Sequence, residues 1–368
     1  MPRTTDINDD SRISHGRNRL SLISSRRGIV DVQFNWIFVL VAGFVIFLFI
    51  ISIVFSQKHA AETQTSMSAM NQITTILQSK QQTGDVYSET DIPLTTMKFT
   101  CDPDYGLFSY IISDGKRADL PTTIMFAPPE VTTNKILIWS QSWSAGFPIG
   151  VFTYLTTKDY MILIYSTPPQ DGAQESSSDP RGYASQIYND IQGNITRKLV
   201  SPSELQKYSK YEHKRIICIK GDCPDASEAM NMDYLMINPG TKGLYAYGNV
   251  TFFNKGVADG EELPYITKAG LYGAVFSYSP EFYSCQMSRA LGQFEFKRLL
   301  VEKRLELMQQ DIDDTDCKNT MSVALDRAIL PMKDPALNTE NFTSMYEKSE
   351  NLDSWNTDLM LGSCPKMY

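Results

Sequence analysis

The longest uninterrupted apolar stretch of the chain runs from Phe34 to Phe55 and contains no charged side chain. At about 1.5 Å per residue, a helix over this stretch is roughly 33 Å long, enough to cross the hydrocarbon core of a bilayer. The apolar core of a signal peptide is shorter, about 7–15 residues, and a cleavage site of small residues follows it. The pattern therefore predicts a retained transmembrane helix over residues 34–55.

Residues 56–84 then alternate apolar and polar side chains with a helical period. Their apolar side chains recur at spacings of three and four residues: Met67, Met70, Ile73, Ile76 and Leu77. This periodicity predicts that the membrane helix continues as an amphipathic stalk to about Lys80. The high content of Thr, Ser and Gln is the argument for the alternative, a disordered linker. A helical stalk of about 25 residues would hold the next domain about 35 Å above the membrane.

Residues 85–278 carry the pattern of a mixed α/β domain. Short apolar runs bounded by turn residues predict strands at 122–126, 135–140, 160–165, 214–219, 234–238, 244–253 and 271–277. The polar residues 167–179 predict an exposed loop, and Pro180 is placed to start a helix that ends near Lys198. Strands that flank one helix and continue after it are typical of a mixed sheet.

The last part of the chain, residues 279–368, changes to helical periodicity. Ser279 is a favourable N-cap, Pro280 suits the first helical position, and apolar positions then follow one face of a long helix. A second helix is predicted over residues 317–330, and the tail is expected to be coil with a short helix near 342–349. We therefore predict a helical hairpin packed on the α/β domain.

The charges that flank the apolar stretch predict its orientation. Six arginines lie in residues 1–33, whereas Lys58 and Lys80 are the first two basic residues after the stretch. Because basic residues stay on the cytoplasmic side, residues 1–33 are predicted to be a cytoplasmic tail and the large domain to be extracytoplasmic. The expected location is the cell membrane, with a single pass and the lipid bilayer as a partner. A formal net charge of −8 argues against a nucleic-acid partner.

The residues immediately before the apolar stretch carry a short motif. Arg26-Arg27-Gly28 is followed by Ile29 and four further residues, the last of which is Gln33. This arrangement resembles the class III signal of archaeal type IV pilin-like proteins, and the layout resembles that of uncharacterised single-pass archaeal surface proteins. The resemblance implies processing between Gly28 and Ile29 and assembly through the apolar segment. Gln33 stands where pilins commonly carry Glu. The alternative is an uncleaved anchor with a basic flank, whose mature chain begins at Met1 or Pro2.

All six cysteines follow the apolar stretch, which indicates disulfides formed in an oxidising compartment. A hairpin with Lys220-Gly221 at its tip places Cys218 opposite Cys223, and we predict this pair. Cys285 lies in the first turn of the predicted long helix and Cys317 beyond its far end, nearly 40 Å away, which excludes their pairing. Two arrangements stay open: Cys101–Cys285 with Cys317–Cys364, or Cys101–Cys317 with Cys285–Cys364.

Three Asn-x-Thr triplets make glycosylation candidates of Asn194, Asn249 and Asn341, which suits an exported glycoprotein. No metal site or cofactor is predicted. The acidic residues Asp311, Asp313, Asp314 and Asp316 lack the glycine and distal glutamate of a calcium loop, and we interpret them as an interhelical turn that caps the following helix.

One weak motif suggests catalysis. Ser142-Trp-Ser144-Ala-Gly146 is similar to a nucleophile elbow, although Ser142 stands where the tight turn needs glycine, and His213 is the only candidate base. We therefore predict a surface protein that acts by binding or assembly and is not an enzyme. The alternative is an extracytoplasmic serine-type hydrolase. Trp139 and Trp143 are expected either to pack a loop on the sheet or to contact a second copy or another surface protein.

Overall fold

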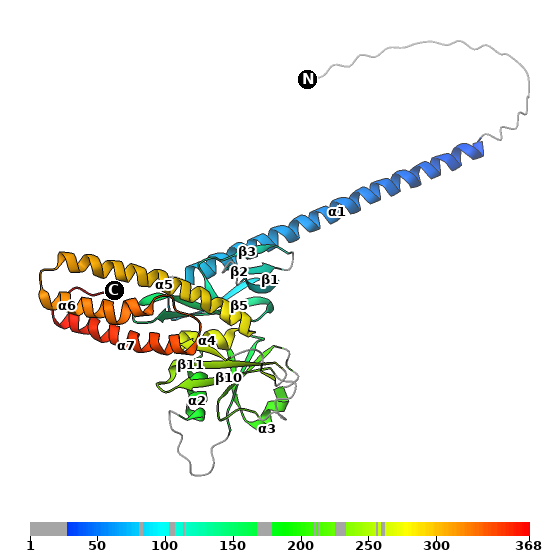
Figure 1. Ribbon diagram of the computed structural model, residues 1–368. Helices are drawn as coiled ribbons and strands as arrows, with labels where there is room; N and C mark the ends of the chain where they lie inside the picture. Colours follow the sequence, from blue (N-terminus) through cyan, green and yellow to red (C-terminus); the bar gives the residue numbers. More distant parts are fainter. Residues whose placement is uncertain are drawn as a thin grey trace, which may run out of the picture. The chain divides into compact units, whose positions relative to one another are not determined.

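The computed structural model describes residues 28–80, 84–102, 107–112, 115–167, 179–208, 211, 213–224, 233–254, 257–258 and 262–368 (Figure 1). The chain divides into two compact units, Met1–Ala61 and Glu62–Tyr368. Within the first unit the structure describes part of one helix. The second unit contains two β-sheets and all the other described helices.

Helix α1 (Gly28–Lys80) contains the whole apolar stretch. Within it, residues Trp36–Lys58 are long and apolar enough to span a membrane, and none of this segment is buried. In the described part of the chain it is the one helix that meets these criteria. Large apolar side chains are exposed along it, from Trp36 to Phe55. The long apolar helix predicted at the N-terminal end is therefore confirmed.

The C-terminal part of α1 belongs to the core of the second unit. Ala69, Ile73 and Leu77 are buried, and the last two pack in one cluster with the side chains of the first sheet. The hydroxyl of Tyr110, on a strand of that sheet, donates a hydrogen bond of 2.9 Å to the carbonyl oxygen of Met70. The amphipathic face predicted for this segment is thus a packing face of the domain, rather than the surface of a free-standing stalk.

The first sheet has six strands in the order β3-β2-β1-β5-β6-β4. Their bounds are β1 Val86–Asp102, β2 Leu107–Ile112, β3 Arg117–Asp119, β4 Ile124–Phe126, β5 Glu130–Ser144 and β6 Pro148–Thr156. All neighbours are antiparallel except β4 and β6. From Thr95 to Thr100 of β1, buried residues alternate with half-buried or exposed ones, as expected for a strand with one face on the core.

The second sheet has the order β12-β11-β10-β9-β7-β8, with β13 paired to β11. Its strands are β7 Met161–Tyr165, β8 Thr196–Val200, β9 Lys214–Ile219, β10 Tyr234–Gly240, β11 Gly243–Asn254, β12 Val257–Ala258 and β13 Leu263–Ile266. Strands β8, β7, β9 and β10 are parallel, and the other pairs are antiparallel. Two mixed sheets therefore replace the single mixed sheet that the sequence predicted.

Two sequence predictions in this region are wrong. Helix α2 (Pro180–Asp190) ends well before Lys198, which lies in β8; after β8 the short helix α3 (Pro202–Leu205) and a 3-10 turn (Gln206–Tyr208) follow. The apolar run predicted as a strand at 271–277 is helix α4 (Thr267–Phe276), in which every residue from Ala269 to Phe276 is buried. A short run that is apolar on all sides suits a buried strand and a buried helix equally, so periodicity does not distinguish them.

Helix α4 occupies the centre of the fold. It contacts β5 and β6 of the first sheet as well as β11 and β13 of the second. Its Tyr272 and Phe276 rings pack against Trp139 of β5 and Tyr154 of β6. The largest cluster of buried side chains therefore includes residues of both sheets and of the helices.

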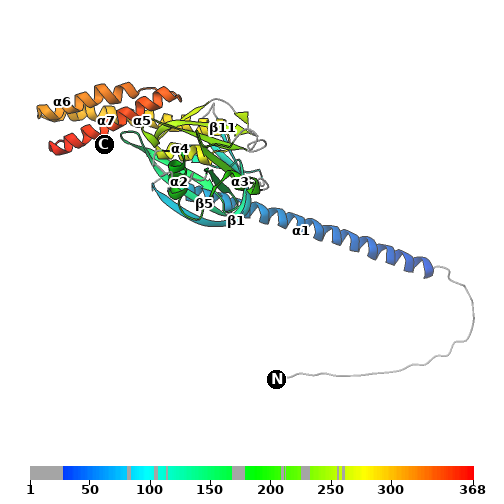
Figure 2. The ribbon, with the colours of Figure 1, turned by 90° about the horizontal axis from the view of Figure 1, so that it is seen from below.

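The C-terminal region contains α5 (Pro280–Asp311), α6 (Thr315–Ala324) and α7 (Thr339–Leu361), and Figure 2 shows the three helices side by side. A π-helical turn (Leu325–Ile329) and a 3-10 turn (Leu330–Met332) follow α6. The start of α5 agrees with the sequence, because the Ser279 hydroxyl accepts a hydrogen bond of 3.2 Å from the backbone N–H of Phe282. Instead of a hairpin with a short helical tail, the region forms three helices, and α7 has 23 residues.

Candidate functional site

The residues of the suggested nucleophile elbow lie in a different structure from the one that motif requires. Ser142 and Ser144 are exposed at the end of β5, and strand β6 follows after a turn in which Gly146 has a φ of +79°. The hydrolase motif requires a strand, a sharp turn and then a helix. The structure shows a strand, a turn and an antiparallel strand.

The candidate base lies far from these serines. His213 lines a hollow next to Glu130, the first residue of β5, whereas Ser144 is the last residue of that strand. Because a strand rises about 3.3 Å per residue, the 15 residues of β5 separate its two ends by about 45 Å. The structure does not bring His213 together with Ser142 or Ser144.

The two tryptophans considered as contact residues are buried. Trp139 and Trp143 both lie in β5 with 0% and 1% of their surface exposed. The ring of Trp143 packs against Phe152 of β6, with 4.9 Å between the ring centroids. Neither side chain is on the surface, so a contact with a partner through Trp139 or Trp143 is not supported. Both belong to the sheet itself and not to a loop packed on it.

One of the acidic residues between α5 and α6, Asp314, caps α6, as predicted for this turn. One carboxylate oxygen of Asp314 accepts hydrogen bonds of 2.9 Å from the backbone N–H groups of Asp316 and Cys317. Among the described residues, no group of three or more His, Cys, Asp or Glu side chains is arranged to hold a metal ion.

The cysteines form three pairs. The pair Cys218–Cys223 is confirmed, and the bridge between Ile219 and Asp222 forms the hairpin that sets it. Of the two arrangements left open by the sequence, the structure has Cys101–Cys285 with Cys317–Cys364. Because α5 is a single helix of 32 residues, its two ends are too far apart for Cys285 to reach Cys317.

The three glycosylation candidates differ in their surroundings. Asn194 is exposed before β8, and its side-chain amide donates a hydrogen bond to Glu89. Asn249 lies within β11 between two paired strands, and its amide oxygen accepts a hydrogen bond of 2.8 Å from the Thr339 hydroxyl. Asn341 is half-buried in the first turn of α7. Glycosylation at each stays a prediction.

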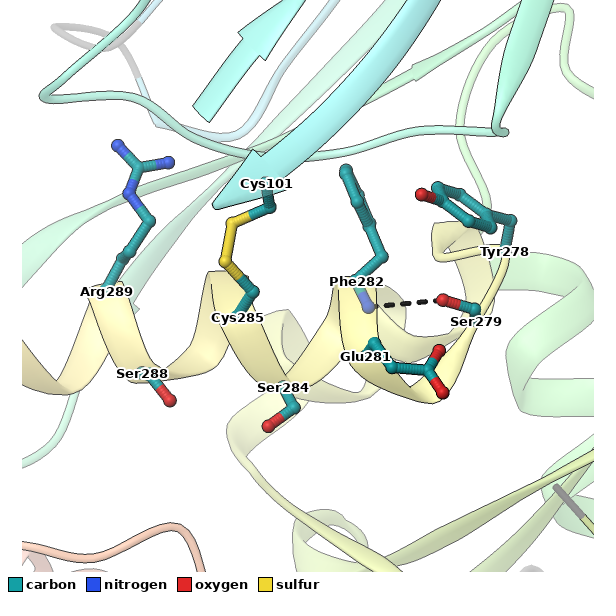
Figure 3. A pocket seen from close by; sticks show the side chains of 9 residues that line it. All are labelled: Cys101, Tyr278, Ser279, Glu281, Phe282, Ser284, Cys285, Ser288 and Arg289. Carbon is teal, nitrogen blue, oxygen red and sulfur yellow. Dashed lines mark hydrogen bonds between the residues drawn. A yellow bond between two sulfur atoms is a disulfide. The ribbon is translucent and has the colours of Figure 1, made fainter. Parts of the chain in front are cut away.

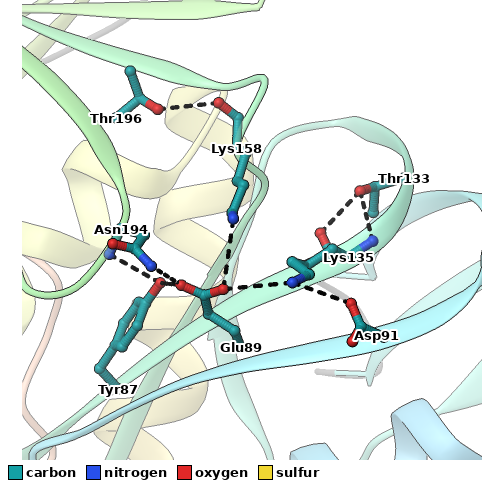
Figure 4. A network of polar contacts seen from close by, with 8 residues as sticks. All are labelled: Tyr87, Glu89, Asp91, Thr133, Lys135, Lys158, Asn194 and Thr196. Atoms are coloured by element: carbon teal, nitrogen blue, oxygen red, sulfur yellow. Dashed lines mark hydrogen bonds and ion pairs between the residues drawn. The ribbon is translucent and has the colours of Figure 1, made fainter.

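A polar network around Glu89 joins the two sheets (Figure 4). Glu89, on β1, accepts a hydrogen bond of 2.9 Å from the Tyr87 hydroxyl and pairs with Lys135 and Lys158 at 3.7 Å each. From the side of the second sheet, the backbone N–H of Asn194 donates to the Tyr87 hydroxyl at 3.0 Å. The network was not predicted from the sequence, because Asn194 is more than 100 residues from its partners and no local pattern connects them.

The hydrogen bonds of the network change the acidity of its members. The hydrogen bond that the Asn194 side chain donates is the main cause that lowers the pKa of Glu89, and the hydrogen bond from Tyr87 is the second. The positive charges of Lys158 and Lys135 lower this pKa further. Burial is the main cause that raises the pKa of Tyr87, to about 12. Glu89 is therefore charged and Tyr87 protonated at neutral pH, which is the state that this hydrogen-bond pattern requires.

Replacing Glu89 with Gln is expected to reduce the loss of stability in acid. Because the pKa of Glu89 is lower in the folded state, the carboxylate stabilises the fold above its ordinary pKa of 4.5, and this contribution is lost as the pH falls through the folded-state pKa. The melting temperature of the native chain, measured from pH 7 to pH 3, should fall more steeply at the acid end than that of Glu89→Gln. The exposed Glu347→Gln variant serves as the control, and curves of equal slope for Glu89→Gln and the native chain would contradict the assignment.

A hollow with a volume of about 760 Å³ lies along the first turns of α5 (Figure 3). The Cys101–Cys285 disulfide and the ring of Phe282 form one part of its lining. Ser284 and Ser288 point away from the disulfide, and Arg289 donates hydrogen bonds to the carbonyl oxygens of Leu120 and Pro121 at 3.0 and 2.8 Å. The hydroxyls of Ser284 and Ser288 and the guanidinium of Arg289 are hydrogen-bond donors. The described residues that line this hollow include no histidine and no cysteine thiol.

Further along α5, one face of the helix carries a row of exposed apolar side chains. Phe296, Leu299, Leu300 and Leu307 are each about half exposed or more. Leu299 and Leu300 follow Phe296 by three and four residues, and Leu307 follows Leu300 by seven. Helical residues with this spacing share one face. Exposed apolar surface of this kind is typical of protein contact sites.

No protein-family model, no curated protein and no solved structure matches the chain. The resemblance of residues 26–33 to a class III signal therefore stays a prediction.

Proposed function

We propose that the chain is a single-pass surface protein of the cell membrane that acts by binding or assembly. The observation that carries this proposal is the segment Trp36–Lys58, which is long and apolar enough to span a membrane and whose large apolar side chains are exposed from Trp36 to Phe55. Each large apolar side chain gains roughly 1.5–3 kcal/mol when it leaves water. A bilayer supplies that burial along the whole segment.

The charges and the cysteines support the orientation. Six arginines precede the span within residues 1–33, whereas Lys58 is the first basic residue after the apolar stretch. This asymmetry favours an N-terminal tail in the cytoplasm and the domain outside. The three disulfides of the domain suit an oxidising compartment, in which such bonds persist.

Two features support binding over hydrolysis. The exposed row on α5 offers apolar surface to another macromolecule. Ser144 and Glu130, which lines a hollow with His213, lie at opposite ends of the 15-residue strand β5. A serine-reactive probe that labels Ser142 or Ser144 in the native chain, together with turnover lost on His213→Ala, would favour the hydrolase.

Membrane anchoring is expected to depend on the apolar character of the span. In cells that express the full chain, Val45→Arg combined with Leu48→Arg should move the protein from the alkali-washed membrane pellet to the soluble fraction. Each arginine costs about 2.5–3.5 kcal/mol at the centre of a membrane helix. The control is Met67→Arg, an exposed position outside the span, which should stay in the pellet.

The same preparation tests orientation and processing. Protease added outside intact cells should digest the domain and spare a tag at the N-terminus. We expect N-terminal sequencing to find Met1 or Pro2, whereas Ile29 would establish processing after Gly28. A native chain that is soluble after alkaline washing, or a double arginine variant that stays in the pellet, would refute the anchor.

A further inference from the structure

A second hollow, of about 290 Å³, lies at one edge of the second sheet. Strands β7, β9 and β10 are parallel and begin at this edge, so Tyr160, His213–Arg215 and Asp233 line the hollow together. The antiparallel strand β11 ends there and contributes Phe252 and Phe253. None of these residues belongs to the membrane span, so a site in this hollow is independent of the proposed function.

The unusual group in this hollow is Arg215, whose surface is only 5% exposed. Its guanidinium donates hydrogen bonds to the carbonyl oxygen of Ser277, and at 3.5 Å to that of Ala274, at the C-terminal end of α4. It also lies over the ring of Phe252, 5.0 Å from the ring centroid. Its Nε–H has no hydrogen-bond partner among the described residues.

Arg298 is a second buried arginine, and unlike Arg215 it has close ionic partners among the described residues. It is 1% exposed and forms ion pairs of 2.7 Å with both Glu295 and Glu302. For Arg215, no ion pair with a carboxylate is found within the described part of the chain. A buried charge without a close ionic partner keeps much of its desolvation cost, and the dipole of α4 offsets that cost only in part. Accordingly, burial lowers the pKa of Arg215 more than the nearby Tyr160 and Asp233 raise it.

The other lining groups limit what the hollow can hold. Its two carboxylates are Glu130, which is paired with Lys98 at 3.1 Å, and Asp233. Their negative charge opposes a doubly charged anion such as phosphate more than a single carboxylate. The rings of Tyr160, Phe253 and Tyr278 supply apolar walls. A few convergent polar groups between apolar walls are typical of small-molecule sites.

We propose that this hollow binds a small organic carboxylate. The carboxylate of the ligand pairs with the guanidinium of Arg215, which lines the hollow, and the apolar body of the ligand lies against the aromatic walls. The pairing supplies Arg215 with the negative partner that Arg298 has in Glu295 and Glu302.

Benzoate is the probe, and benzamide is its uncharged match in size. The full chain, purified in detergent, should show a saturable rise of its melting temperature with benzoate and none with benzamide at equal concentration. Inorganic phosphate should give a smaller shift than benzoate. Arg215→Lys keeps the charge but lacks the planar guanidinium, and should weaken benzoate binding about tenfold or more.

Two further variants keep the test decisive if Arg215→Lys does not fold. His213→Glu adds a negative charge at an exposed position of the rim and should weaken benzoate binding through repulsion. Arg197→Lys is the control, because Arg197 also donates to a backbone carbonyl, that of Tyr188 at 2.7 Å, but lies outside the hollow. Equal shifts with benzoate and benzamide, no shift at all, phosphate binding as tight as benzoate binding, or native affinity in His213→Glu would each overturn the proposal.

Discussion

Replacing Trp139 with alanine is expected to lower the free energy of unfolding of the domain by about 3–5 kcal/mol, the range for a large aromatic side chain removed from a core. Trp139 is fully buried, and its ring centroid lies 4.7 Å from that of Tyr272 and 5.1 Å from that of Tyr154. Because α4 contacts strands of both sheets, the cavity would open where the sheets share their core. Denaturant unfolding of the full chain in detergent, followed by near-UV circular dichroism, measures the change.

Two other variants test whether the loss of stability comes from the buried packing of Trp139 or from the removal of a tryptophan at any position. Trp355 of α7 is only half-buried, so Trp355→Ala should cost clearly less than Trp139→Ala. Trp139→Phe should fall between the native chain and Trp139→Ala, because the indole N–H of Trp139 has no hydrogen-bond partner among the described residues. Equal costs for Trp139→Ala and Trp355→Ala would show that the fold does not depend on contacts around α4 in this way.

Removal of a disulfide is expected to lower the free energy of unfolding of the domain, and the loss should be larger for a disulfide that closes a longer loop. The separations are 184 residues for Cys101–Cys285, 47 for Cys317–Cys364 and 5 for Cys218–Cys223. The chain-entropy relation then gives losses of about 5, 4 and 2 kcal/mol, because a longer loop restricts the unfolded chain more. Three double variants, each with both cysteines of one pair replaced by alanine, can be compared by denaturant unfolding under identical conditions.

Alanine is the suitable replacement, because Cys218, Cys285 and Cys317 are buried and serine would add a polar group there. The Cys218–Cys223 variant is the internal control, since its hairpin is also held by the hydrogen-bonded bridge between Ile219 and Asp222. Equal losses in all three variants, or the largest loss for Cys218–Cys223, would contradict the entropic order.

Several sequence predictions failed where long-range packing decides the outcome. The elbow motif at Ser142–Gly146 is local, but a motif does not specify whether a strand or a helix follows, and here β6 pairs back on β5. The segment after Pro335 contains the buried residues Phe342, Met345, Leu352 and Leu359, whose spacing suits a helix, and it forms the 23-residue α7. Arg215 was not predicted as a site residue, although a charged residue before the apolar run at 216–219 was a signal that could have found it.

Features that depend on residues close in the chain could be predicted from the sequence. The apolar character of residues 34–55, the cap of Ser279 on α5 and the hairpin that joins Cys218 to Cys223 each follow from a few neighbouring residues. Packing in three dimensions was needed to establish that α4 is a helix, that two sheets share one core and that Cys101 pairs with Cys285. These outcomes rest on contacts between distant segments. The free energy of such contacts depends on which surfaces pack against each other, and the local sequence pattern does not specify this.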